Sequence, residues 1–296
     1  MRLNLPSHLL VVALSLLTGC LIVFPASAAP FSFSTGNPDG LIGTASRPDA
    51  LGAFEIESAD DFLLTQPTSI NSVSFTGLLV GGNISNLALT QTVLEIYRVF
   101  PADSNVARTS GPPTFSTPQV PTRVNSPSDV EFVGAAIGDF SSVTATQVSP
   151  TFTVGNSVTP GGIHPFPNQT TLGNGSQTGQ EVQFTVNLSN PFVLPPDHYF
   201  FVPQVAMDQG FFLWLSAPRP IVPPGTPFMP DLQSWTRDAN LDPDWLRVGT
   251  DIVGGTTPPT FNAVFSLTGV TVPEPTTLAL LGLALGGLAF ARRRPH

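Results

Sequence analysis

The sequence predicts an all-β fold, a single large β-sandwich of jelly-roll-like type over residues 29–271. Short segments rich in β-branched and aromatic residues recur along this stretch, separated by Gly, Pro, Asn and Asp turns, which is typical of sandwiches. No sustained helical period occurs between the two ends of the chain, and 41% hydrophobic residues suffice for a sizeable core. Two smaller sandwiches are the alternative.

The clearest predicted strand is residues 261–267, where odd positions are mostly apolar, as expected of a strand with one buried face. Residues 111–127 and 218–230 are rich in Pro and are expected to be long loops, because strand patterns resume on either side. The segments expected to form strands are residues 53–57, 71–79, 92–100, 130–133, 142–148, 151–154, 181–188, 198–205, 211–215 and 260–267.

Charged residues are scarce, at 10% of the chain, and the formal net charge is −9. All 11 basic residues are Arg, so chemistry that needs a lysine amine, such as a Schiff base or a phosphate-binding P-loop, is excluded. An acidic chain with few cations has little with which to neutralise phosphates, and we expect no nucleic-acid partner.

The N-terminus has the pattern of a secretory signal peptide, residues 1–28, which the general secretion machinery would export. Arg2 precedes an apolar run over residues 9–24, and the small residues Ala26 and Ala28 would direct cleavage. Leu17-Thr18-Gly19-Cys20 offers the alternative of a lipoprotein signal with an acylated cysteine. If cleavage follows Ala28, the mature chain has no cysteine, which excludes disulfides, zinc thiolates and cysteine nucleophiles.

The C-terminal residues 272–296 combine three features in a fixed order. Pro273, Glu274 and Pro275 precede an uncharged run over residues 276–291, and Arg292, Arg293 and Arg294 follow it. As a helix the run would span about 24 Å, slightly less than the roughly 30 Å of a hydrocarbon core. The arginines favour a cytoplasmic end, with the body outside the cytoplasm. A core helix of a soluble domain is the alternative, although the run lacks a polar stripe.

This tail resembles the PEP-CTERM sorting signal, also called an ice-binding-protein C-terminal domain, a name that implies nothing about ice here. The resemblance implies that an exosortase recognises Pro273, Glu274 and Pro275 and removes the helix. Residues 276–291 would be a transient anchor in the inner membrane, and Arg292, Arg293 and Arg294 the stop-transfer cluster. It also implies a cell-surface or extracellular-matrix protein associated with exopolysaccharide in a biofilm.

The body offers few residues for catalysis, and we expect no enzyme and no cofactor. Only His164 and His198 lie outside the two signals, too few for a local metal triad, and no Gly-x-Ser-x-Gly elbow occurs. Glycosidic cleavage needs only two carboxylates, so a secreted carbohydrate-active enzyme on a β-sandwich is an alternative. Spacing along the chain cannot pair the acids on or near strands, Glu55, Glu57, Glu95, Glu131 and Glu181.

One acidic segment has the spacing of a calcium loop, with oxygen side chains at alternate positions, namely Asp238, Asn240, Asp242 and Asp244. Such a site would make the protein a calcium-dependent adhesion module. The pattern departs from a calcium loop at Pro243, in place of the loop glycine, and at Gly249, where a bidentate Glu would close the shell. Turn formation by Asp and Asn explains the same residues.

Three tryptophans, Trp214, Trp235 and Trp245, lie in the last third of the body. Indole rings on sandwich domains can stack against the apolar face of a sugar. Trp235 and Trp245 flank the acidic segment and are the candidates for carbohydrate binding. Trp214 lies in an apolar segment and is expected to be buried.

Overall fold

The computed structural model describes residues 28–111, 114–164, 170–218 and 232–273. Residues 29–272 form one compact unit. Of the predicted cleavage and sorting residues, Ala28 and Pro273 fall within the described part of the chain. The rest of both predicted signals lies outside the described residues, namely residues 1–27, Glu274, Pro275, the apolar run 276–291 and Arg292–Arg294.

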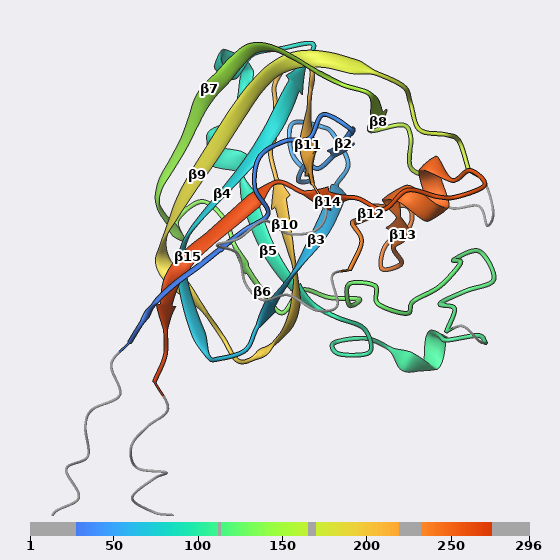
Figure 1. Ribbon diagram of the computed structural model, residues 1–296, viewed down its shortest axis with the longest axis horizontal. Helices are drawn as coiled ribbons and strands as arrows, with labels where there is room; N and C mark the ends of the chain where they lie inside the picture. Colours follow the sequence, from blue (N-terminus) through green and yellow to red (C-terminus); the bar gives the residue numbers. More distant parts are fainter. Residues whose placement is uncertain (1–27, 112–113, 165–169, 219–231, 274–296) are drawn as a thin grey trace, which may run out of the picture. The chain divides into compact units, whose positions relative to one another are not determined.

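The larger sheet has nine strands, built around the long strand β4 (Thr68–Val80). One edge of β4 pairs with β9, and the other edge pairs first with β15 and then with β11 (Figure 1). All pairings are antiparallel except that of β2 with β8. The other strands are β1 (Pro30–Ser34), β2 (Ile42–Ala45), β7 (Phe140–Val154), β8 (Asn156–Val158), β9 (Gln177–Leu194), β11 (Phe211–Ala217), β14 (Asn262–Ala263) and β15 (Phe265–Thr271).

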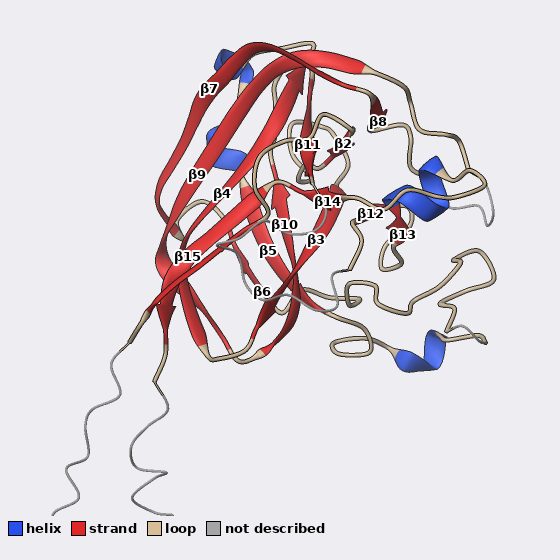
Figure 2. Cartoon of the chain, viewed as in Figure 1, coloured by secondary structure: helices blue, strands red, loops and turns tan. Residues whose placement is uncertain are grey.

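The smaller sheet has six antiparallel strands in the order β13-β12-β3-β10-β5-β6. Helical structure in the described residues is limited to short turns at the margins of the sheets (Figure 2). The strands are β3 (Ile56–Leu64), β5 (Val93–Arg98), β6 (Val133–Ala135), β10 (Asp197–Gln204), β12 (Trp235–Asp238) and β13 (Leu246–Arg247), and the turns are η1 (Ile84–Asn86), η2 (Leu89–Gln91), η3 (Val106–Arg108) and η4 (Val248–Val253).

An aromatic core joins the two sheets. Phe75 of β4 and Phe184 of β9 stack with ring centroids 4.9 Å apart, and Phe201 of β10 contacts Phe75 and Phe265 from the smaller sheet. Of the alternation predicted over residues 261–267, the part at 265–267 is confirmed, because Phe265 and Leu267 are buried and Ser266 is half-buried, whereas Asn262 and Val264 are buried like their odd-numbered neighbours. The all-β prediction is therefore confirmed, with two sheets packed across one core.

The observed strands differ from the predicted ones at several places. Of the strand expected at 130–133 only Val133 belongs to a strand, β6, and the strand expected at 260–267 is divided into β14 and β15. Residues 142–148 and 151–154 belong to one strand, β7, in which Pro150 sits in an irregular part of the pairing with β9. The strand expected at 53–57 begins only at Ile56 and continues to Leu64, through the buried acids Asp60 and Asp61. Acidic residues are disfavoured in strands, and their presence masked this strand in the sequence.

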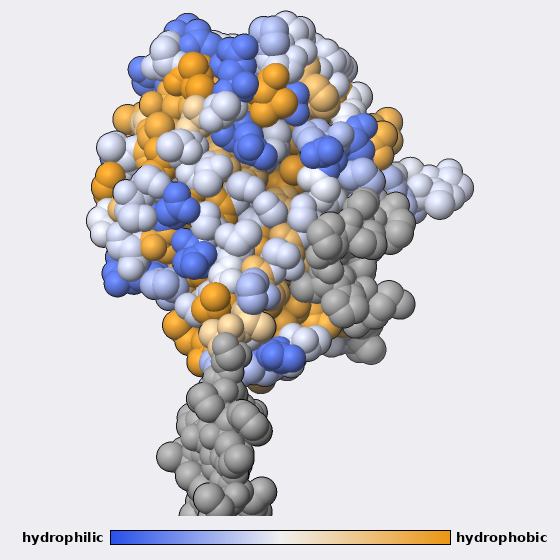
Figure 3. Space-filling model, turned by 60° about the vertical axis from the view of Figure 1, so that its left-hand side comes forward, coloured by the Kyte–Doolittle hydropathy of each residue, from blue (hydrophilic) through white to orange (hydrophobic). Residues whose placement is uncertain are grey.

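The outer face of the larger sheet carries rows of small hydroxyl side chains across five neighbouring strands. Register places Ser34, Ser266, Ser74, Thr185 and Thr144 side by side in one such row. The β7 side comes forward in Figure 3, where the pale colours of weakly hydrophilic residues predominate across the centre. We call this the hydroxyl-rich face; its two rows hold Ser32, Ser34, Ser72, Ser74, Ser142, Thr144, Thr185, Asn187, Ser266 and Thr268, all uncharged.

Candidate functional site

The outer face of the smaller sheet gathers charged and uncharged polar side chains from four strands or their ends. Antiparallel register sets Glu57 of β3 directly opposite Arg237 of β12. Glu95 and Tyr97 alternate along β5 and so project from one face. The set, here called the carboxylate cluster, consists of Glu55, Glu57, Glu95, Tyr97, Gln204 and Arg237.

Arg237 is the centre of the carboxylate cluster and is 4% exposed. Its Nε and Nη2 donate to the two oxygens of Glu57, and Nη2 also donates to the Tyr97 hydroxyl at 3.0 Å. The guanidinium lies 4.3 Å from the ring centroid of Trp245, close enough for a cation–π contact. The Nη1 atom lies 2.9 Å from Asp242 Oδ1. These partners compensate the cost of burying the charge.

Two further carboxyl groups share one amide donor. Gln204 Nε2 donates to Glu55 Oε1 at 3.0 Å and to Glu95 Oε2 at 3.4 Å. Burial, reinforced by the charges of Glu57 and Glu55, raises the pKa of Glu95 to about 9. Burial also raises the pKa of Glu55. This pKa favours the protonated form of Glu95 at neutral pH, and a buried carboxylic acid can act as a proton donor.

The structure joins three of the five acids that spacing alone could not pair. Glu55, Glu57 and Glu95 meet in the carboxylate cluster, whereas Glu131 lies in the loop before β6 and Glu181 on β9. Arg237 and Tyr97 were not predicted as site residues. The alternation of Glu95 and Tyr97 within one predicted strand was the available signal for Tyr97.

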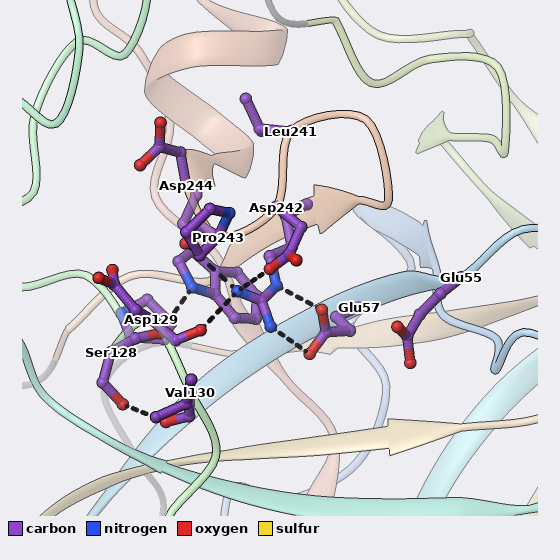
Figure 4. A network of polar contacts seen from close by, with 12 residues as sticks. Glu55, Glu57, Ser128, Asp129, Val130, Leu241, Asp242, Pro243 and Asp244 are labelled. Atoms are coloured by element: carbon purple, nitrogen blue, oxygen red, sulfur yellow. Dashed lines mark hydrogen bonds and ion pairs between the residues drawn. The ribbon is translucent and has the colours of Figure 1, made fainter. Parts of the chain in front are cut away.

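The predicted calcium loop is wrong. Asp238 Oδ1 accepts hydrogen bonds from the backbone nitrogens of Asn240 and Leu241, both at 3.0 Å, which closes a turn after β12. Asp242 faces Arg237, and Asp244 pairs with Arg108 and Ser116. Figure 4 shows Asp244 directed away from Asp242. Across the described ranges no three His, Cys, Asp or Glu side chains could hold a metal, and the side chains of Asp238, Asp242 and Asp244 serve the turn and ion pairs instead.

The predicted sugar platforms are wrong as well. Trp235 is 1% exposed and Trp245 is 2% exposed, so neither ring presents a face to solvent. Trp245 Nε1 donates to the Ser128 carbonyl at 3.0 Å, while its ring lies against Arg237. Trp214 is buried, as predicted, and donates to the Val264 carbonyl at 2.8 Å.

Comparison with known proteins gives one family match, the PEP-CTERM protein-sorting motif at residues 271–294. This confirms the resemblance seen at Pro273, Glu274 and Pro275. The motif is that of an exported protein that transits the membrane and is processed by an exosortase. No curated protein and no solved structure matches the chain. Within the described residues, no helix has the length and apolar character needed to cross a membrane.

Proposed function

We propose that this is a non-enzymatic protein of the cell surface or extracellular matrix, whose jelly-roll-like body associates with exopolysaccharide in a biofilm. The sorting motif at residues 271–294 is the observation that supports export and processing by an exosortase. In this proposal residues 1–28 direct secretion, residues 276–291 anchor the chain transiently in the inner membrane, and the body stays outside the cytoplasm. Processing then releases the body to the cell surface or its surroundings.

The hydroxyl-rich face supports the association with exopolysaccharide. Its ten residues carry no charge, although the chain as a whole has a net charge of −9. Hydroxyl and amide groups can both donate and accept hydrogen bonds, which suits a neutral polymer that is itself covered with hydroxyls. Strands in a sheet are spaced about 4.8 Å apart, so the rows of this face present such groups at short regular intervals.

Replacing Glu274 with Ala, or deleting Arg292–Arg294, is expected to leave most of the chain unprocessed and to reduce surface display. The first change removes the acid of the recognition motif, and the second removes the charges that stop transfer. Membrane fractionation with mass spectrometry of both termini measures the processed fraction. Glu131→Ala, which alters an exposed glutamate of the body, is the matched control. Unchanged processing and display in both tail variants would refute the proposal.

A second candidate, a carbohydrate-active enzyme, is favoured by the Glu55 and Glu95 pair alone. Both carboxyls contact Gln204 Nε2, and Glu95 holds a proton at neutral pH. Glycoside hydrolysis uses such a pair, one group as acid and the other as base or nucleophile. Incubation of the protein with exopolysaccharide, followed by a reducing-end assay, tests it. Release of reducing ends that is lost in Glu95→Gln but kept in Glu131→Gln would replace the non-enzymatic proposal.

A further inference from the structure

The larger sheet ends on one side in the strand β7, which forms its left-hand margin in Figure 1. The 15 residues of β7 pair with β9 along one edge, and no strand within the described ranges pairs with the other edge. The other edge strands, β1, β6, β8, β13 and β14, are short, with two to five residues each. A long open edge exposes backbone N–H and C=O groups that can pair with a strand of another chain.

β7 lacks the charges by which proteins usually block an open edge. No acidic or basic residue occurs anywhere in the strand. Pro150 interrupts only its far end, and residues 142–147 pair with β9 without a register shift. The β-branched residues in or next to this regular part are Val143, Thr144, Thr146 and Val148. An uncharged, regular run of such residues favours pairing with another strand.

The apolar side of this edge is incompletely covered. On β9, Phe184 and Val186 are fully buried, whereas Ala145 and Val143, which lie opposite them on β7, are only half-buried. These two residues of β7 pack against the main core from its margin. Val148, further along the strand, is 56% exposed. A strand added beside β7 would remove apolar surface from water at this margin.

A second copy of this chain is the partner that fits the edge. It offers an identical open edge of the same length, and two identical edges can pair antiparallel about a two-fold axis. Each chain has a net charge of −9, but pairing along β7 sets no charged side chain opposite another. The exposed hydroxyls of Thr144 and Thr146 would meet their own counterparts, and pairs of threonines across two strands are favourable.

We propose that two copies of this protein form a dimer by antiparallel pairing of their β7 strands around residues 142–148. The two-fold axis closes the contact, so the pair does not extend into a fibre. One strand from each copy makes a small interface, and the dimer is therefore weak. The dimer does not depend on exopolysaccharide. Side chains that face each other across an antiparallel pair project from the same face, so dimerisation would join two hydroxyl-rich faces into one surface.

Sedimentation of the full chain in detergent, over a range of concentrations, tests the dimer. A monomer–dimer equilibrium with a Kd on the order of 10 μM is expected for an interface of this size. Thr146→Lys should weaken dimerisation about tenfold or more, because a lysine on an edge strand opposes further pairing. Gln183→Lys is the matched control and should dimerise normally. Gln183 lies directly opposite Thr146 on β9 and is also exposed, so the same charge is added one strand away from the edge.

Cysteine cross-linking identifies the strand that pairs. Thr144→Cys and Thr146→Cys, separately and mixed, are treated with a short bismaleimide in a Cys20→Ser background, since Cys20 is the one cysteine of the sequence. Pairing at β7 brings these positions close to their counterparts, and a covalent dimer is expected. Gln183→Cys is the control and should not cross-link, because about three strand spacings, roughly 14 Å, would separate it from its counterpart.

Several results would overturn the dimer. One is a protein that stays monomeric at concentrations about 100-fold above the expected Kd. Others are equal dimerisation in Thr146→Lys and Gln183→Lys, cross-linking of Gln183→Cys as efficient as that at β7, or a series of higher oligomers. Thermal unfolding of both lysine variants checks that the fold is retained. Retention of a monomeric protein on exopolysaccharide would overturn the dimer alone and leave the proposed function standing.

Discussion

Arg237→Met is expected to destabilise the protein by about 3–5 kcal/mol, because it leaves a buried carboxylate without its counter-ion. The side chains of Arg237 and Glu57 are 5% and 4% exposed, and the guanidinium contacts both Glu57 oxygens. The substitution also removes the contact with the Trp245 ring. Urea unfolding followed by tryptophan fluorescence measures the change in the free energy of unfolding.

Arg98→Met is the matched control for this prediction. Arg98 pairs with Asp103 at 2.5 Å, but the two side chains are 29% and 22% exposed, so the expected loss is at most about 1 kcal/mol. The double variant Glu57→Gln and Arg237→Met should lose less stability than the sum of its single changes, since each single change leaves a partner unpaired. Equal losses for Arg237→Met and Arg98→Met would contradict a central role for the buried pair.

The sequence was a good guide to strands whose side chains alternate and a poor one to strands that bury acids. The segment at residues 181–188 is confirmed as part of β9, because Val182, Phe184 and Val186 all face the core. In contrast, β12 holds Arg237 and Asp238 within a segment read as a turn-forming acidic cluster. Its charges can be buried because the neighbouring strand supplies partners that compensate them. These partners lie far away in the sequence, so the residues around β12 do not reveal them.

The carboxylate cluster could not be predicted from the sequence for the same physical reason. Glu57 and Arg237 are 180 residues apart in the chain, and only strand pairing brings them into contact. The same pairing explains the two wrong predictions. Asp242, read as a calcium ligand, meets Arg237, and Trp245, read as a sugar platform, is covered by it. The cation gives Asp242 a counter-ion, although the Asp242 side chain stays 54% exposed, and it covers a face of the buried Trp245 ring.

The stability of the protein is expected to fall as the pH rises from about 4.5 to about 9, and Glu95 is the principal cause. Its pKa is raised to about 9 in the folded state from the ordinary value of 4.5 for a glutamate. Between these values the folded protein holds a proton that the unfolded chain has released, so folding binds a proton and higher pH disfavours it. The slope is at most about 1.4 kcal/mol per pH unit for one such group. Glu55, with its raised pKa, acts in the same direction.

Glu95→Gln should remove most of this pH dependence. The amide keeps the shape and hydrogen-bonding capacity of the protonated acid but has no proton to release. We therefore expect nearly equal free energies of unfolding for the two proteins at pH 5 and a clear gain for the variant at pH 8, measured by urea unfolding at each pH. Glu131→Gln, at an exposed position, should follow the unmodified protein throughout. A profile that is flat from pH 5 to pH 9 in the unmodified protein would mean that Glu95 is ionised in the folded state, and that the cluster has no neutral carboxylic acid to serve as a proton donor.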